Sequence, residues 1–396
     1  MELFDTSAVI PSKLGPKDYA ESVFQFLETS GRTAFVKIRR FLEGWFSLYP
    51  DDEKAKLRSS FRAKEGVESP LFELALYNVF HKMGAEIQIH PAIEGTGNKP
   101  DFHIRLKSGF EFYLEAIVVR GVSDKDVVRE NMEQNIYGII DHKLKSPEFF
   151  LSVHVLARGV NVPSENQLIS DLSNHLSSIS HVKAVKDYAE NGHINYDEVY
   201  TFVWEHKGWK IEFVPLPKTE EAIGKSSHRP IGAIESGVVY STTKEDIRNA
   251  VEFKIKHHKK VTKPIIIAVN STHWSTDEED FRNALYGSII VSVDLSSRES
   301  HAYQDTDGVW RNKKELRNQN LIAVIGAQML THTTLASQNL VVYQNPYIPY
   351  PDEAKMELLS HVFPEPETKL GRTDGSTLGE IFGLPSDWLQ DDVIDD

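Results

Sequence analysis

Three acidic residues in the first third of the chain, Glu73, Asp101 and Glu115, have a spacing that suits metal chemistry. Carboxylate oxygens are the ligands that hard divalent cations such as Mg²⁺ prefer, and Mg²⁺ keeps several of its waters when it binds. Two carboxylates and a backbone carbonyl are therefore enough to form a candidate site, provided that the fold brings them together.

The residues around Asp101 and Glu115 have the pattern of two neighbouring strands. Asp101 opens the stretch DFHIRL, and Glu115 lies within FYLEAIVV. The link between them contains Ser108-Gly109, which is typical of a hairpin turn. Side chains alternate between the faces of a strand, so Asp101 shares a face with His103. We expect the two acids to lie on adjacent strands, close enough to share one divalent ion, and His103 to be a structural imidazole.

Glu73 belongs to a segment that precedes these strands. The stretch SPLFELALYNVFHKMG has apolar residues at helical spacing, and the short alternating stretch EIQIHP follows it. A helix packed on the strands would let Glu73 reach the same place as a third acid.

Taken in this order, Glu73, Pro100-Asp101 and Glu115 resemble the motif of the PD-(D/E)XK nuclease superfamily. The chain is also similar, over most of its length, to a set of bacterial proteins with that core. The similar segments are FELALYNVFHKMGAEIQIHP, PDF, YLEA, KPIIIAVN, ALYG, DGVW and QNPYIPYP.

The resemblance implies an α/β fold in which helices flank a mixed β-sheet, as in restriction endonucleases. It implies hydrolysis of phosphodiester bonds, with DNA as the favoured substrate, in bacterial defence or repair. Mg²⁺ or Mn²⁺ would be the cofactor. Asp101, Glu115 and the carbonyl of Ala116 would hold the ion, and Glu73 would ligate it or orient water.

One residue departs from the superfamily pattern. A lysine is expected two residues after the second strand acid, where it orients the attacking water and stabilises developing charge, but Ile117 stands there. Lys99, Arg105, Arg120 and Lys125 are nearby in the sequence. Lys99 is the preferred substitute, because on a regular strand it shares the face of the acid two residues later.

Two alternatives to the nuclease interpretation stay open. In the first, which the missing lysine favours, the core is degenerate and binds nucleic acid or a protein partner without cutting it. In the second, the fold is different and the acids never meet. The distance between the carboxylates of Asp101 and Glu115 tests the metal-site reading, because about 4 to 6 Å would suit one shared ion and more than about 10 Å would be too far.

Composition limits the class of protein. The chain has 396 residues, enough for two or three domains, with 40% hydrophobic and 26% charged residues. There are no cysteines, which excludes disulfides and thiolate metal sites. The N-terminus lacks the layout of a signal peptide, and the apolar runs are too short to cross a bilayer, so a cytoplasmic protein without membrane contact is expected. The net charge of −14 argues against coating nucleic acid by bulk positive charge, but a local basic surface could still bind it. A homodimer is left open.

The order of elements predicts three regions: an N-terminal helical segment at 1–64, the nuclease-like core at 65–222, and a C-terminal α/β region at 223–396 that ends in an acidic tail. The last region either continues the core sheet or folds alone. Within the core, one sheet is expected to contain strands at 86–90, 101–106, 111–119 and 149–156.

The most basic stretch, KIKHHKK, runs from Lys254 to Lys260. On a helix, Lys256, Lys259 and Lys260 would face roughly the same way as Lys263, an arrangement suited to phosphate groups. A solvated helix face is the preferred interpretation.

Overall fold

The computed structural model describes the whole chain except residues 6–9, 20, 64–65, 94–98, 122–123, 226–228, 236–241, 258–260, 262, 294–299, 311–319, 367–368 and 391–396. At 124–129, 191–198 and 301–302 it describes the backbone but not the side chains. The chain forms two compact units. The larger unit comprises residues 1–16, 22–121 and 241–396, and the smaller one comprises 17–21 and 122–240.

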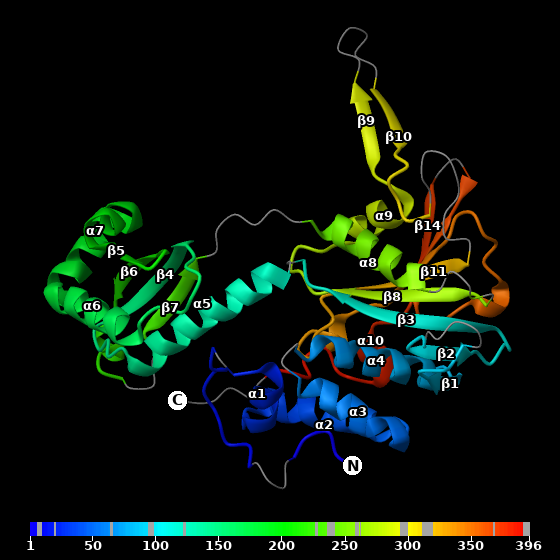
Figure 1. Ribbon diagram of the computed structural model, residues 1–396, viewed down its shortest axis with the longest axis horizontal. Coiled ribbons are helices and arrows are strands. Elements are labelled where there is room, and N and C mark those ends of the chain that lie inside the picture. Colours follow the sequence, from blue (N-terminus) through cyan, green and yellow to red (C-terminus); the bar gives the residue numbers. More distant parts are fainter. Residues whose placement is uncertain are drawn as a thin grey trace. The chain divides into compact units, whose positions relative to one another are not determined.

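An eight-stranded mixed sheet is the centre of the larger unit (Figure 1). Its strands, in spatial order, are β1 (Glu86–Ile89), β2 (Phe102–Arg105), β3 (Glu111–Val119), β8 (Ile265–Ser271), β11 (Leu321–Gln328), β12 (Val341–Gln344), β13 (Ser360–Pro364) and β14 (Leu370–Thr373). β8 runs parallel to β3 on one side and to β11 on the other. Every residue of β8 is buried, as expected for a central parallel strand that is covered on both faces.

Helices cover both faces of this sheet. One face packs against the N-terminal helices α1 (Val23–Thr29), α2 (Thr33–Ser47), α3 (Asp51–Phe61) and α4 (Glu68–Lys82). The other face packs against α8 (Thr243–His257) and α9 (Glu278–Tyr286). Figure 1 shows these two layers on opposite sides of β3 and β8. The short helix α10 (Leu378–Phe382) lies near the end of the chain.

Alternation along β3 explains which side chains meet which helices. Phe112 and Leu114 point into the core formed with α4, whereas Tyr113, Ile117 and Val119 contact the apolar side chains of α8. Glu115 lies two residues from both Tyr113 and Ile117, so its side chain is on the same face of β3, towards α8.

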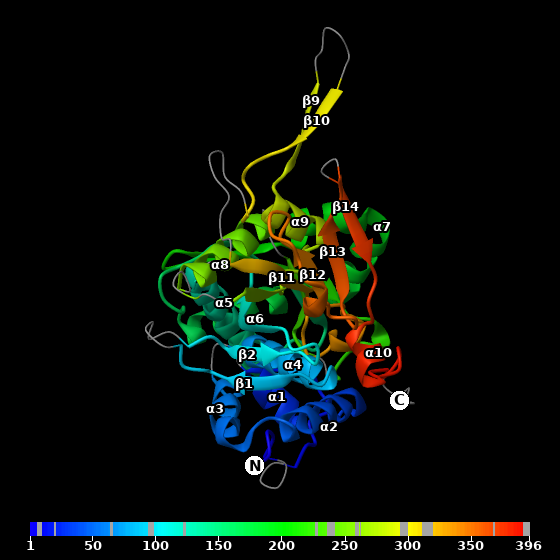
Figure 2. The same ribbon diagram turned by 90° about the vertical axis from the view of Figure 1, so that its right-hand side faces the viewer.

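A two-stranded hairpin of β9 (Ile289–Val293) and β10 (Ser300–Gln304) follows α9 and extends away from the sheet (Figures 1 and 2).

The smaller unit has its own sheet and its own core. Its four strands are, in spatial order, β5 (Phe202–His206), β6 (Trp209–Pro217), β4 (Phe149–Ala157) and β7 (Ile231–Glu235). Its helices are α5 (Asp124–Lys143), α6 (Glu165–Ser178) and α7 (His181–Tyr200). Apolar side chains of α5, α6 and α7 pack on this sheet. Among the helices described in either unit, none is both long enough and apolar enough to cross a membrane.

The predicted α/β fold with a mixed sheet and flanking helices is confirmed. The strands expected at 86–90, 101–106 and 111–119 are present and belong to one sheet. The prediction that 149–156 joins them is wrong, because β4 lies in the sheet of the smaller unit and β8 occupies the place beside β3.

The bounds of the observed units differ from those of the expected regions 1–64, 65–222 and 223–396. The chain leaves the larger unit after residue 121 and returns at 241. Of the strands after 241, β8, β11, β12, β13 and β14 continue the sheet of β1 to β3, whereas β9 and β10 form a separate hairpin. The C-terminal region therefore continues the core sheet, one of the two possibilities that the sequence left open.

Candidate active site

Asp101 and Glu115 are brought together by the pairing of β2 with β3. Phe102 pairs with Leu114 in an antiparallel register, so Asp101, one residue before β2, comes opposite Glu115. Two backbone contacts hold Asp101 at this point. The N–H of Ala116 donates to Asp101 Oδ2 at 2.7 Å, and the N–H of His90 donates to the Asp101 carbonyl at 2.9 Å.

A third charged group, Lys254 of α8, contacts both acids. Its Nζ lies 2.6 Å from Glu115 Oε2 and 3.4 Å from Asp101 Oδ2. The Glu115 side chain is only 5% exposed, and those of Asp101 and Lys254 are 23% and 21% exposed. This is a largely buried cluster of two carboxylates and one ammonium.

The packing of α8 explains why Lys254 reaches the acids. Ile247, Val251 and Ile255 form the buried stripe by which this helix packs on β3 and β8. Lys254 is three residues after Val251 and directly before Ile255, which places it beside that stripe. Its side chain therefore extends under the helix towards the sheet.

Burial and the charges of neighbouring groups both shift the pKa values of Asp101 and Lys254. Burial raises the pKa of Asp101 to about 6; Lys254 and the Ala116 N–H oppose this rise, whereas Glu115 and Glu73 add to it. Burial alone would lower the pKa of Lys254, but the charges of Asp101 and Glu115 outweigh it, and the pKa is raised. The lysine is thus held in its charged form.

The two carboxylates are close enough to share one ion. Since both oxygens contact the same ammonium nitrogen, they cannot be farther apart than the two contact distances placed end to end. That separation is far below the about 10 Å that would exclude a shared ion.

The residues present fit a magnesium ion. Within the described part of the chain, no group of three or more His, Asp or Glu side chains is arranged to hold a metal. However, Mg²⁺ in phosphate-handling enzymes is usually held by only one or two carboxylates together with water and substrate phosphates. Asp101 and Glu115 carry two negative charges against one positive charge of Lys254, so the cluster has an excess of negative charge that a cation would neutralise.

The carbonyl of Ala116 is also suited to this role. If the register of β2 and β3 is continued beyond Phe102, Pro100 comes opposite Ala116. Proline has no N–H to donate to the ladder. The strand pairing thus ends where the candidate ion site begins.

Glu73 lies near this cluster but contacts neither strand acid among the described hydrogen bonds. Its Oε1 accepts a hydrogen bond of 2.7 Å from the hydroxyl of Tyr49. Its charge nevertheless contributes to the raised pKa of Asp101. Glu73 is one of the few polar residues on α4, which is buried on nearly all sides.

Lys99, the preferred substitute for the missing lysine, is exposed, and no hydrogen bond or ion pair described in the structure joins it to either acid. Arg105 pairs with Glu111 at 3.7 Å, and Arg120 pairs with Glu68 at 3.7 Å. The side chain of Lys125 lies outside the described part. Among the described residues, the cation in contact with Asp101 and Glu115 is Lys254, and the role predicted for Lys99 stays a prediction.

Ile117, two residues after Glu115, packs with the apolar side chains beneath α8. The sequence contained one signal for Lys254, because it is the first residue of the basic stretch KIKHHKK. Its position three residues after Val251, beside the buried stripe of α8, distinguishes it from the exposed Lys256. Of the proposed phosphate-binding lysines, Lys259 and Lys260 lie outside the described residues.

His103 belongs to a second polar group on the same face of β2 and β3. Its Nε2 lies 3.1 Å from Lys263 Nζ and 3.3 Å from Glu111 Oε2, and Lys263 also pairs with Glu111. Burial and the charge of Lys263 lower the pKa of His103. These contacts agree with a structural imidazole.

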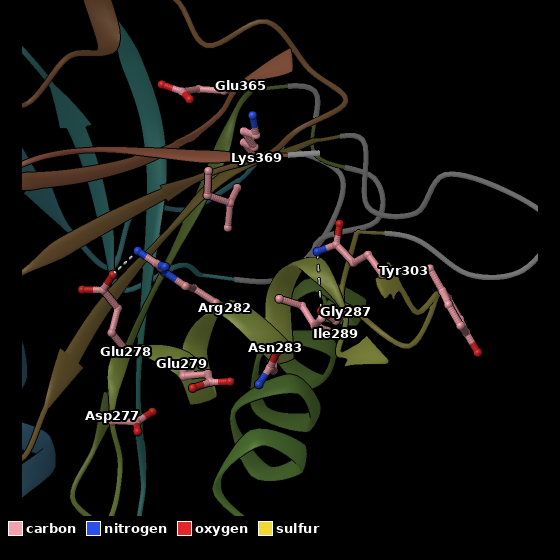
Figure 3. Close-up of a pocket in the computed structure, with 12 residues that line it drawn as sticks. Asp277, Glu278, Glu279, Arg282, Asn283, Gly287, Ile289, Tyr303, Glu365 and Lys369 are labelled. Atoms are coloured by element: carbon pink, nitrogen blue, oxygen red, sulfur yellow. Dashed lines mark hydrogen bonds and ion pairs between the residues drawn. The ribbon is translucent and has the colours of Figure 1, made fainter. Parts of the chain in front are cut away.

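A pocket lies elsewhere in the same unit (Figure 3). It has a volume of about 790 Å³ and is lined by residues of α9, the base of the β9–β10 hairpin and β14. Arg282 in this pocket is paired with Glu278 at 2.6 Å. The acid–lysine cluster does not line this pocket, and its buried charges make it the stronger candidate for chemistry.

In comparisons with protein-family models, with curated proteins and with solved structures, nothing matched this chain.

Proposed function

We propose that this protein is a metal-dependent nuclease that hydrolyses phosphodiester bonds, with DNA as the favoured substrate and bacterial defence or repair as the setting. The observation that carries the proposal is the contact of Lys254 with both Asp101 and Glu115. A PD-(D/E)XK site needs two acids and one cation at a single point. Here a lysine from α8 supplies the cation that the sequence of β3 lacks.

Asp101 and Glu115 would hold Mg²⁺ or Mn²⁺, together with the carbonyl of Ala116. A bound divalent ion supplies acidity to water at neutral pH and positive charge at the phosphate. The ammonium of Lys254 has three N–H donors. It favours the ionised form of both carboxylates and can donate to a phosphate oxygen whose charge grows in the transition state.

Glu73 has a supporting role in this proposal. The hydroxyl of Tyr49 fixes one of its oxygens, and the other can accept a hydrogen bond from water near Asp101. Glu73 would thereby orient water rather than bind the ion directly.

A second candidate is a degenerate core that binds nucleic acid or a protein partner without cutting. The contact of Lys254 with Asp101 and Glu115 also favours this candidate, because the lysine already neutralises part of the negative charge that would attract an ion. In that case the cluster would be a buried ion pair, and added Mg²⁺ would have no effect on the protein.

Cleavage of labelled DNA and RNA with Mg²⁺ or Mn²⁺, with and without a chelator, tests the proposal. We expect cleavage by the wild-type protein, loss of cleavage on chelation, and loss in Asp101→Asn and Glu115→Gln. Glu111→Gln is the matched control, because Glu111 is an acid on the same strand that pairs with Lys263 instead of Lys254.

If Asp101→Asn cleaves at the wild-type rate, the proposed site is wrong. If the wild-type protein cleaves no DNA or RNA with either metal and yet binds nucleic acid, the second candidate replaces the first.

A further inference from the structure

The hairpin of β9 and β10, here called the arm, has no neighbouring strand in the described structure. Its strands, of five residues each, pair antiparallel from Ile289 with Gln304 to Val293 with Ser300. Figures 1 and 2 show from two directions that it extends away from the rest of the larger unit. A two-stranded ladder of this size is at best marginally stable alone in water. The arm therefore needs support at its base or a partner along its length.

Support at the base comes from Asp307. Its Oδ1 accepts a hydrogen bond of 2.9 Å from the N–H of Ser288, and its carboxylate also pairs with Lys244 of α8. Arg248 of α8 donates to the Asp307 carbonyl at 3.0 Å. These contacts fasten the first residue before β9 to a helix of the core. They do not extend along the arm.

Along its length the arm exposes aliphatic side chains on one face. Ile289, Val291 and Val293 are 67%, 59% and 56% exposed. Because they alternate along β9, they lie on the same face of the ladder. Single exposed apolar residues are common, but a row on one face of an unsupported ribbon marks an interaction surface. The edges of the two strands carry no Lys or Pro, the residues that usually prevent pairing with another chain.

The charge of the arm indicates what kind of partner fits it. The sequences of β9 and β10, IIVSV and SHAYQ, contain no Lys, Arg, Asp or Glu. Nucleic acid does not fit this face, because binding depends on cations that neutralise phosphates. A second copy of the chain does fit. With a net charge of −14, two copies repel each other over most surfaces, but here they can meet without burying an unpaired charge.

The ladder is also suited to self-contact in shape. Val291 and Val293 are paired with Ala302 and Ser300, so large residues on one strand stand beside small ones on the other. In a two-fold symmetric contact the same patch faces itself. The β9 row of one copy can then lie over the β10 side of its partner.

We propose that the arm is the surface through which two copies of this chain associate, with Ile289, Val291 and Val293 of each copy packed over the β10 strand of the other. This inference does not depend on nuclease activity. Three aliphatic side chains from each copy bury less than the about 1,200 Å² of the smaller stable interfaces. The dimer is therefore weak and forms only at high protein concentration.

Sedimentation over a series of protein concentrations tests this. We expect the wild-type protein to pass from monomer to dimer, and Val291→Lys to stay monomeric at every concentration. Ser292→Lys is the matched control, because it adds the same charge one residue further on, on the opposite face, and should still dimerise. Circular dichroism of both variants checks that they are folded. A wild-type protein that remains monomeric at its highest soluble concentration overturns the proposal.

Cross-linking gives a second, independent measurement. The chain has no cysteine, so a single introduced thiol reports on one position. With a short bis-maleimide, Val291→Cys should give covalent dimers at concentrations where the wild-type protein sediments as a dimer, and Ser292→Cys should give few. Equal yields from the two variants would show that this face is not the contact.

Discussion

At the scale of single residues, burial and the charge of Lys254 act on the pKa of Asp101 in opposite directions. Its carboxylate is largely removed from water beside Glu115, and Lys254 compensates only in part, so its pKa rises to about 6. A group of this kind reduces the stability of the folded state. Such groups are found where a carboxylate serves chemistry or binding more than packing.

This gives a prediction for stability against pH. An acid whose pKa is higher in the folded than in the unfolded state takes up a proton on folding, so stability is lost as pH rises between the two values. For Asp101 these are about 6 and the ordinary 3.8. Asp101→Asn, which keeps an oxygen for the Ala116 N–H, should therefore raise the free energy of unfolding at pH 7.5 by on the order of 3 kcal/mol.

The gain should disappear below about pH 4, where Asp101 is protonated in both states. Urea unfolding at pH 7.5 and at pH 4 measures it. A variant that is less stable than the wild-type protein at pH 7.5 would show that the Asp101–Lys254 contact outweighs the cost of burial.

The meeting of Asp101 and Glu115 was predictable because it depends on a short hairpin, whose turn and alternation are local features. Lys254 was not predictable in the same way. It is separated from Glu115 by 139 positions, and its contact depends on how α8 packs across β3 and β8. Sequence periodicity identifies the buried stripe of a helix, but it does not say which strand that stripe covers.

At the scale of elements, the helix expected around Glu73 and the strands expected at 86–90, 101–106, 111–119 and 149–156 are all present, because each has its own local pattern. The stretch IIIAVNS of β8 is an uninterrupted apolar run, and α9 has acidic residues at its start. The helices α7 and α10 and the strands β7, β10, β13 and β14 were not identified. The four strands are short, and strands such as SHAYQ lack a clear apolar alternation.

The start of α9 gives a prediction at this scale. Asp277 accepts a hydrogen bond of 2.9 Å from the N–H of Asp280, and the Asp280 side chain bonds the Asp277 N–H in return. Asp277→Ala should lower the free energy of unfolding by about 1 kcal/mol, because a helix N–H loses its partner. Asp277→Asn should cost much less, because asparagine also caps helices well. Thermal unfolding of both variants measures the difference, and equal losses would mean that the cap contributes little.

At the scale of the whole molecule, the smaller unit interrupts the larger one between residues 121 and 241. Local patterns could not predict this, because helices and strands alternate in the same manner in both units. Whether β4 or β8 lies beside β3 is decided by contacts between residues that are far apart in the sequence. The buried face of β3 is completed only when the chain returns as α8 and β8.

The same return of the chain brings Lys254 to the acids, so the proposed site is complete only in the assembled larger unit. Glu73, Asp101 and Glu115 come from the segment before the interruption, and Lys254 comes from the segment after it. We propose that Lys254 supplies the positive charge for which the superfamily pattern has a lysine where Ile117 stands.

The most direct test is the single-turnover rate of Mg²⁺-dependent cleavage by Lys254→Met, compared with Lys99→Met. Both changes remove one lysine charge, but only Lys254 contacts Asp101 and Glu115. We predict a rate lower by a factor on the order of 100 or more for Lys254→Met, as for other losses of one preorganised charge-stabilising group, and an unchanged rate for Lys99→Met. Folded Lys254→Met protein that cleaves at the wild-type rate would contradict the account.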